Sequence, residues 1–394
     1  MEYRVLRPEE LEQAARVQAQ SFLYGTSEGL RESLQKPDLN HSVTYGAVAE
    51  DGTVAACMNV LPFEQYLDGT ALKMFGIGGV ASLVQYRRGG AVRRLFETIF
   101  RDYREQGYAL SYLYPFSHRY YRKFGYEQAC RYHWATGPTE GLRSIQAPEG
   151  RAEQLTPGMD LKEVMDVYDA FACRHNLMLR RSSDRMKLEV DHDPVDTQSR
   201  GFLWRNAQGE AKAFLRVLAK SGQPLFVEQL FYVDEGGLMG ALALLGNYAG
   251  NIEKVTLRCP PEVRPEWIWP EPNELECTEG PLGMGRILDV VQALAALDTP
   301  EAAGRVVVEV LDDFWPDNTG RYALQWEKSG SQVQPGCTDT PDLIVSVQAL
   351  LPLIMGTESL RTLAALRPDI TVLGERETLF DLFPKELTYI EDHY

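Results

Sequence analysis

The sequence predicts an α/β protein of the α+β kind, with mixed central sheets in three consecutive domains. Three observations predict this class. Up to about residue 140 the patterns run helix, antiparallel strands, a Gly- and Arg-rich turn, helix, strand and short helix. The middle of the chain repeats this order more weakly, and beyond Pro300 β-branched strands precede short helices. We therefore expect domains at 1–145, 146–285 and 286–394.

The first helix begins near Pro8 and carries an apolar face toward Phe22. Two hairpins with acidic and glycine turns are expected to follow. Their strands are Tyr45–Ala49 with Val54–Val60, and Phe63–Leu67 with a strand from Leu72 that continues through Gly79–Leu83.

After Gly90 the apolar period changes from two to 3.6, which predicts a helix that ends at Gly107. Ala109–Tyr114 is then a short strand. His118–Phe124 is a short helix that Gly125 terminates.

The same patterns place the later elements. In the middle we expect a helical face from Leu161 to Phe171, strands at Gly201–Asn206, Ala211–Leu218, Phe226–Tyr232 and Lys254–Leu257, a helix at Leu238–Tyr248, and a loop or edge at Pro260–Glu279. In the last domain we expect strands at Arg305–Leu311, Arg321–Trp326 and Leu343–Val347, and helices at Ala349–Ile354, Glu358–Ala365 and Glu375–Phe383.

The composition is that of a globular, acidic protein. The 394 residues are 44% hydrophobic and 24% charged, and 40 Lys and Arg against 56 Asp and Glu give a net charge of −16. This balance argues against a partner that is nucleic acid or an anionic membrane, and it permits cationic ligands. No apolar run approaches the roughly 20 residues of a membrane span, and the start, MEYRVLRPEE, is unlike a signal peptide.

The six cysteines and six histidines are scattered, and no CxxC pair occurs. This usage is typical of a reducing compartment and predicts a cytoplasmic protein. Asp191-His192-Asp193 has metal-binding residue types, but nothing nearby completes a site. We therefore expect a solvated loop there and no metal.

The turn Arg87-Arg88-Gly89-Gly90 lies between the end of a strand and the start of a helix. Glycines allow close approach of the backbone, a helix N-terminus presents free N–H groups, and the arginines add positive charge. This combination suits a pyrophosphate, although it is neither a Walker A motif nor a GxGxxG turn. The alternative is a glycine-rich turn with solvated arginines.

Tyr120-Tyr121-Arg122-Lys123-Phe124-Gly125-Tyr126 forms the second informative segment. A tyrosine phenol, with an ordinary pKa near 10, is protonated at neutral pH and can donate a proton to a leaving thiolate. Packing in the core is the alternative role. His118 is another possible donor, or a structural or exposed loop residue.

Together these segments resemble the GNAT N-acetyltransferases, whose pattern is [RQ]xxGx[GA] after a strand and a YxxxGF-like element downstream. Arg87-Arg88-Gly89-Gly90-Ala91-Val92 matches except at Val92, where the family has a small residue, and Tyr121 to Tyr126 matches the second element. Over its whole length the chain resembles the enhanced intracellular survival (Eis) family. That family has two GNAT-type domains and a sterol-carrier-protein-like domain, and Leu311-Asp312-Asp313-Phe314 fits the last of these.

The resemblance implies that the first domain binds acetyl-CoA as the acetyl donor and that the second does not. In the second, Val233-Asp234-Glu235-Gly236-Gly237 has acids where phosphate-binding arginines would be needed. By resemblance, Val80 and Ser82 bind the pantetheine arm through their backbones, while Arg87, Arg88, Gly90 and Ala91 contact the pyrophosphate.

The resemblance also implies the catalytic groups. Tyr121 would be the general acid, and the α-carboxylate of Tyr394 would be the base that accepts the amine proton. Glu391 and Asp392 would help to hold an ammonium substrate. The alternative for this tail is a frayed, solvated terminus.

We therefore expect an N-acetyltransferase that acetylates primary amines of a polycationic small molecule, aminoglycoside-like or polyamine-like, by direct transfer. The resemblance implies a ring-like homo-hexamer. One rival is a non-catalytic lipid- or ligand-binding protein that uses its C-terminal domain, and another is a protein-lysine acetyltransferase. The side chains that would line a lipid cavity, or simply fill a core, are Val306, Val308, Val310, Ile344, Val345, Val347 and Leu351.

Overall fold

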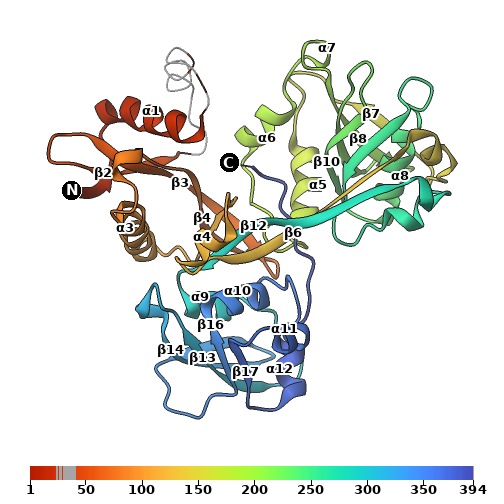
Figure 1. The fold of residues 1–394 in the computed structure, drawn as a ribbon. Coiled ribbons are helices and arrows are strands. Elements are labelled where there is room, and N and C mark those ends of the chain that lie inside the picture. Colours follow the sequence, from red (N-terminus) through yellow and green to blue (C-terminus); the bar gives the residue numbers. More distant parts are fainter. Residues whose placement is uncertain (24, 26–28, 30–40, 394) are drawn as a thin grey trace. The chain divides into compact units, whose positions relative to one another are not determined.

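The structure is a computed structural model that describes residues 1–23, 25, 29 and 41–393 (Figure 1). It divides into two compact units, which we describe separately. The first contains residues 1–129, 282–386 and 392–394, and the second contains residues 130–281 and 387–391. The chain therefore enters the second unit twice, once for its main body and once for five residues of the C-terminal tail.

The N-terminal part of the first unit contains a mixed sheet, as predicted. Strands β1 to β4 are antiparallel neighbours, β4 and β5 are parallel, and β5 pairs antiparallel with the end of β12. The strands are β1 (Glu2–Val5), β2 (Val43–Val48), β3 (Val54–Leu67), β4 (Thr70–Ser82), β5 (Leu110–Leu113) and β12 (Glu276–Ile287).

Strand β3 corrects one expectation. Val54–Val60 and Phe63–Leu67 were expected as strands of two separate hairpins, but β3 runs unbroken from Val54 to Leu67, with Pro62 inside it. The partner β2 ends at Val43, which lies opposite Val60. Pro62 therefore lies beyond the last β2 pair, so its missing N–H removes no hydrogen bond to that strand.

Among the described residues, three helices accompany this sheet: α1 (Leu11–Phe22), α3 (Ala91–Glu105) and α4 (His118–Arg122). The predicted apolar stripe of α3 is buried, and Gly125 has the left-handed conformation, with φ of +81°, expected after α4. The buried side chains of α3 are Ala91, Leu95, Phe96, Ile99, Phe100 and Tyr103.

A five-stranded sheet in the order β15-β14-β13-β16-β17 forms the C-terminal part of the first unit. Of the side chains considered for a lipid cavity, Ile344 is half-buried and the other six are at most 3% exposed. The elements are α9 (Val290–Ala295), β13 (Gly304–Leu311), β14 (Gly320–Glu327), β15 (Gly330–Pro335), β16 (Leu343–Ser346), α10 (Val347–Ile354), α11 (Leu360–Leu366), β17 (Ile370–Val372) and α12 (Arg376–Leu382).

A buried ion pair lies within the first unit, between the end of β12 and the loop after β13. Arg286 Nη2 donates to Asp312 Oδ2 at 2.5 Å, and both side chains are fully buried. The guanidinium lies against Gly125, where an added Cβ would be 2.6 Å from Arg286 Cζ. Gly125, the glycine of the second sequence motif, is thus required for two reasons: its φ is positive, and the Arg286 guanidinium leaves no room for a side chain.

Replacing Asp312 by Asn is expected to destabilise the protein strongly, because it leaves a buried guanidinium without its counter-charge. The expected cost is about 3–5 kcal/mol, or a fall in melting temperature of roughly 10 °C. Asp317→Asn is the control: this aspartate, 69% exposed, pairs with Arg104 at 3.3 Å, and its loss should cost at most about 1 kcal/mol. Equal thermal shifts for the two variants would contradict the prediction.

The second unit also contains a mixed sheet, in the order β6-β11-β10-β9-β8-β7. The prediction of a loop or edge over Pro260–Glu279 is wrong for its last four residues, because β12 already begins at Glu276. These four residues are exposed and polar or small, so they carry no apolar strand pattern. The elements are β6 (Glu127–Pro138), β7 (Gly150–Gln154), α5 (Lys162–Ala172), α6 (Ser183–Val190), α7 (Pro194–Thr197), β8 (Ser199–Asn206), β9 (Ala211–Leu218), β10 (Leu225–Tyr232), α8 (Glu235–Gly246) and β11 (Lys254–Arg258).

Within the described part of the chain, no helix is both long enough and apolar enough to cross a membrane.

Candidate active site

A cavity of about 800 Å³ opens in the first unit beside the last residues of β4. Strands β4 and β5 pair only from Met74 and Leu110 to Ile77 and Leu113, and β4 then continues to Ser82. The edge of β4 beyond Ile77 is therefore left open to a ligand. The cavity is lined by Ser21, Phe22, Val80, Ala81, Ser82, Tyr86, Arg87, Arg88, Gly90, Ala91, Val92, Arg93, Phe116, Tyr120, Lys123 and Phe124.

A bulge shapes the backbone of β4 at this edge. Gly79 and Val80 together lie opposite one residue of β3, and Gly79 has a φ of +58°. Beyond the bulge, Leu83 N–H donates to Ala55 O of the β3 side at 2.9 Å. Because backbone groups alternate along a strand, those of Ser82 point to the opposite, open edge.

The predicted pyrophosphate turn forms the basic end of the cavity. Arg88 and Gly90 have φ of +68° and +80°, and Gly90 is the N-cap of α3 without any side-chain capping bond. Among the described residues, no side chain caps the first N–H groups of α3, which are therefore suited to bind a ligand. Arg87 Nε donates to Ser82 O at 3.3 Å, and Arg88 is exposed.

The charge of the cavity wall is one-sided. Arg87, Arg88, Arg93 and Lys123 line it, and none of the lining residues that the structure describes is acidic. The chain as a whole carries a net charge of −16. The four cations around this one helix N-terminus therefore give it a positive local potential, opposite in sign to the net charge. All six residues expected to bind the cofactor lie in this wall. Their individual contacts remain predictions.

Tyr121, the expected general acid, lies in α4 at the same end of the first unit. Its ring packs against Phe96 and Phe116, with centroid distances of 6.4 and 5.4 Å. Burial, with a smaller contribution from Tyr120, raises the pKa of its phenol above the ordinary value of 10. Within the described residues its hydroxyl has no hydrogen-bond partner. It is Tyr120, and not Tyr121, that lines the cavity.

The end of the tail lies against Tyr114, which follows β5. Tyr114 Oη donates to Asp392 O, and its ring lies 4.9 Å from that of His393. Tyr394, the expected base, lies outside the described residues. Sequence reasoning missed Tyr114 because it belongs to no recognisable motif. Its only signal is an aromatic residue between a buried strand and the expected catalytic helix.

The preceding tail residues are held within the second unit. Asn176 N–H donates to Leu387 O at 2.8 Å, and Tyr389 N–H donates to Asn176 O at 3.0 Å. The Tyr389 ring is buried beneath Arg258, 4.7 Å from its guanidinium carbon, and Glu391 lies 3.7 Å from the same arginine. The tail is thus packed as far as Asp392, while His393 is exposed and touches the protein through its ring contact with Tyr114.

Glu391 and Asp392 were expected to hold an ammonium substrate. In the structure Glu391 faces Arg258, and Asp392 is only 2% exposed, with its carbonyl bound by Tyr114. Their role in binding an amine stays a prediction.

Helix α8 of the second unit has the position in the element order that α3 has in the first, but its N-terminus is closed. Asp234 caps it by accepting from Gly237 N–H at 2.8 Å. A Cβ on Gly237 would lie 2.2 Å from Lys212 O, so β9 packs directly against this turn. A carboxylate already occupies the place where α3 offers free N–H groups beside arginines.

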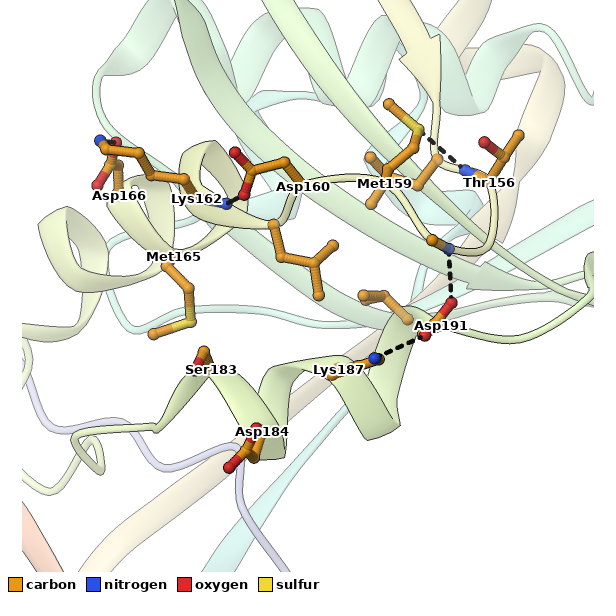
Figure 2. A pocket seen from close by; sticks show the side chains of 14 residues that line it. Thr156, Met159, Asp160, Lys162, Met165, Asp166, Ser183, Asp184, Lys187 and Asp191 are labelled. Atoms are coloured by element: carbon orange, nitrogen blue, oxygen red, sulfur yellow. Dashed lines mark hydrogen bonds and ion pairs between the residues drawn. The ribbon is translucent and has the colours of Figure 1, made fainter.

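A second cavity, of about 500 Å³, lies in the second unit beside the starts of α5 and α6 (Figure 2). Two of its acidic side chains pair with lysines of the same unit. Asp166 pairs with Lys162 at 2.5 Å, and Asp191 pairs with Lys187 at 3.6 Å and accepts from Gly158 N–H at 2.8 Å. None of the residues expected to act in catalysis or binding lines this cavity.

Comparison with protein families gives two matches. Residues 2–129 match the acetyltransferase (GNAT) domain, and residues 290–391 match the sterol carrier protein domain. Comparison with curated protein sequences gives no match. The chain therefore contains a GNAT acetyltransferase domain that includes the cationic cavity, and it is an acyltransferase of that class. GNAT enzymes bind an acyl-CoA and an acceptor.

Several solved structures have this fold along the whole chain. A probable N-acyltransferase from Enterococcus faecalis V583 superposes with a TM-score of 0.85 at 21% identity, covering 100% of this chain and 99% of that one. A GCN5-related N-acetyltransferase from Anabaena variabilis gives 0.84 at 22% identity, and Eis1 from Mycobacterium abscessus gives 0.78 at 17%, each covering 100% of both chains. The predicted combination of a GNAT domain with a C-terminal sterol carrier protein domain in an Eis-like fold is confirmed.

Proposed function

We propose that this chain transfers the acetyl group of acetyl-CoA to a primary amine of a polycationic small molecule, aminoglycoside-like or polyamine-like. One observation carries the proposal. In a chain of charge −16, the open edge of β4 leads to a helix N-terminus with no side-chain cap, and the described residues around it include four cations and no acid. A pantetheine arm paired with that edge, and a pyrophosphate at the helix, fit this arrangement.

The proposed chemistry is direct transfer. The amine nitrogen attacks the thioester carbonyl carbon and loses a proton to the α-carboxylate of Tyr394, the last residue of the sequence. The C–S bond then breaks, and the leaving thiolate takes the phenol proton of Tyr121. The products are an acetamide and CoA with a free thiol. The raised pKa of Tyr121 keeps its proton available at neutral pH.

The packing of the tail supports the carboxylate as base. Tyr114 donates to the Asp392 carbonyl, and its ring contacts that of His393 at a tilt of 35°, so contacts to the tail extend to the residue before Tyr394. A base needs a fixed position near the attacking amine. The capped N-terminus of α8 supports the further proposal that acetyl-CoA binds only the first of the three domains, 1–145, and not the second, 146–285.

Replacing Arg87 and Arg88 together by Ala should raise the KM for acetyl-CoA at least tenfold, because each charge-assisted phosphate contact contributes about 1.5–3 kcal/mol. The measurement is thiol release with a panel of small polyamines, aminoglycosides and lysine peptides. Arg94→Ala is the control, because it removes a charge from α3 outside the cavity wall. An unchanged KM in the double variant would remove the pyrophosphate from this turn.

The same panel separates the rival functions. Thiol release only with lysine peptides would favour a protein substrate. The absence of acetyl-CoA binding to the wild-type protein would leave the lipid- or ligand-binding function of the C-terminal domain as the better interpretation.

A further inference from the structure

The peptide group between Gly79 and Val80 is held from behind by a side chain that does not line the cavity. Gln18 Nε2, from α1, donates to Gly79 O at 3.1 Å and to Asn59 Oδ1 at 3.2 Å. The approach is close, since a Cβ on Gly79 would lie 2.3 Å from Gln18 Nε2.

Gln18 is itself fixed by neighbours on two strands. Asn59, on β3, accepts from Gln18, and Thr44 Oγ1 of β2 donates to the same Asn59 oxygen at 3.1 Å. One helical turn further along α1, Ser21 Oγ donates to Ser82 O at 3.2 Å. Two side chains of α1 therefore hold the carbonyls of Gly79, just before the cavity-lining residues of β4, and of Ser82, the last of those residues.

A trans peptide group is planar, so its C=O and N–H point in opposite directions. The described residues contain no cis peptide bond. Fixing the Gly79 carbonyl therefore also fixes the N–H of Val80, a residue of the cavity wall. A preorganised N–H aimed at a developing oxyanion is the kind of donor that lowers the barrier of acyl transfer.

We propose that Gln18 is a positioning residue for this reaction: by anchoring the Gly79 carbonyl, it orients the Val80 N–H toward the thioester carbonyl oxygen of acetyl-CoA. The inference rests on the proposed function. It assigns to Gln18 no contact with either substrate. Its effect should therefore fall on the polarisation of the carbonyl and on kcat, with little effect on cofactor affinity.

Two variants of Gln18 test the anchor. Gln18→Met keeps the length of the side chain and removes both polar groups. Gln18→Glu keeps the shape but removes the N–H donors. Gln13→Met is the matched control, because Gln13 is also on α1 and accepts from Val54 N–H at 3.2 Å, remote from the bulge. Melting temperatures report whether the variants fold as the wild-type protein does.

The decisive measurement needs no amine. Infrared spectroscopy of bound acetyl-CoA, labelled with carbon-13 at the thioester carbonyl, should give a higher C=O frequency in Gln18→Met and Gln18→Glu than in wild type and Gln13→Met. With an amine present, kcat should fall about 10–100-fold while the KM for acetyl-CoA changes less than about threefold.

Wild-type frequency and kcat in both Gln18 variants would overturn this inference and leave the proposed function intact. A rise in KM with unchanged kcat would overturn it too, since Gln18 would then serve binding alone. If wild-type protein binds no acetyl-CoA, the proposed function fails, and this inference fails with it.

Discussion

Adding one residue after Tyr394 is expected to abolish most amine acetylation, because the added residue converts the α-carboxylate of Tyr394 into an amide that cannot accept a proton. Loss of a general base costs roughly 10²–10⁴-fold in rate. Deleting Tyr394 should have a similar effect, since it shortens the tail by up to about 3.5 Å, enough to break a hydrogen bond. The measurement is kcat with the best amine of the panel.

Tyr394→Phe is the matched control, because it changes the side chain and keeps the carboxylate, and its kcat should be nearly that of wild type. All these variants should bind acetyl-CoA normally, since no described residue of the tail, up to His393, lines the cationic cavity. Full activity in the extended chain would exclude Tyr394 as the base. Glu391, Asp392 and His393 would then be tested for that role.

Tyr121→Phe should lower kcat roughly 10²–10⁴-fold with nearly unchanged binding of acetyl-CoA, because it removes one proton donor and little volume. The raised pKa of Tyr121 has a further consequence. An acid acts while it is protonated, which is below its pKa. Its loss of activity by deprotonation should therefore begin only above pH 10, the ordinary value for tyrosine.

The neighbouring Tyr120 provides the control for this variant. Tyr120 lines the cavity, whereas Tyr121 packs behind it against Phe96 and Phe116. Tyr120→Phe should keep most of kcat if the sequence motif identifies the acid correctly. A large loss in Tyr120→Phe, with normal turnover in Tyr121→Phe, would transfer the role to Tyr120.

Local patterns were sufficient to predict most of the elements around the site. The apolar stripe of α3 and the glycines at 90 and 125 mark real boundaries, since both glycines have positive φ and the stripe is buried. The errors arose where a local signal was outweighed by pairing. The two expected strands Val54–Val60 and Phe63–Leu67 form the single strand β3, and Pro62 is tolerated between them because no β2 residue lies opposite it.

The parts of the site that the sequence could not predict depend on distant contacts. Gln18 and Gly79 are 61 positions apart, and Tyr114 and Asp392 are 278 apart. No periodicity or motif links such residues. A glutamine on an amphipathic helix and a tyrosine after a strand are ordinary in sequence, and only the fold brings them to the bulge and to the tail.

The contacts within the first unit bear on whether the acetyltransferase domain can be separated from the domain that follows it. Phe314, from beyond β13, packs with Phe100 and Phe124 at 5.7 and 5.4 Å, inside the aromatic core of the acetyltransferase domain. Residues 284–287 pair along β5. A truncated chain that stops near residue 145 would therefore leave an aromatic core and a strand edge uncovered. The sterol carrier protein domain therefore supplies part of the aromatic core of the acetyltransferase domain, and we expect its removal to destabilise that domain whether or not it carries lipid.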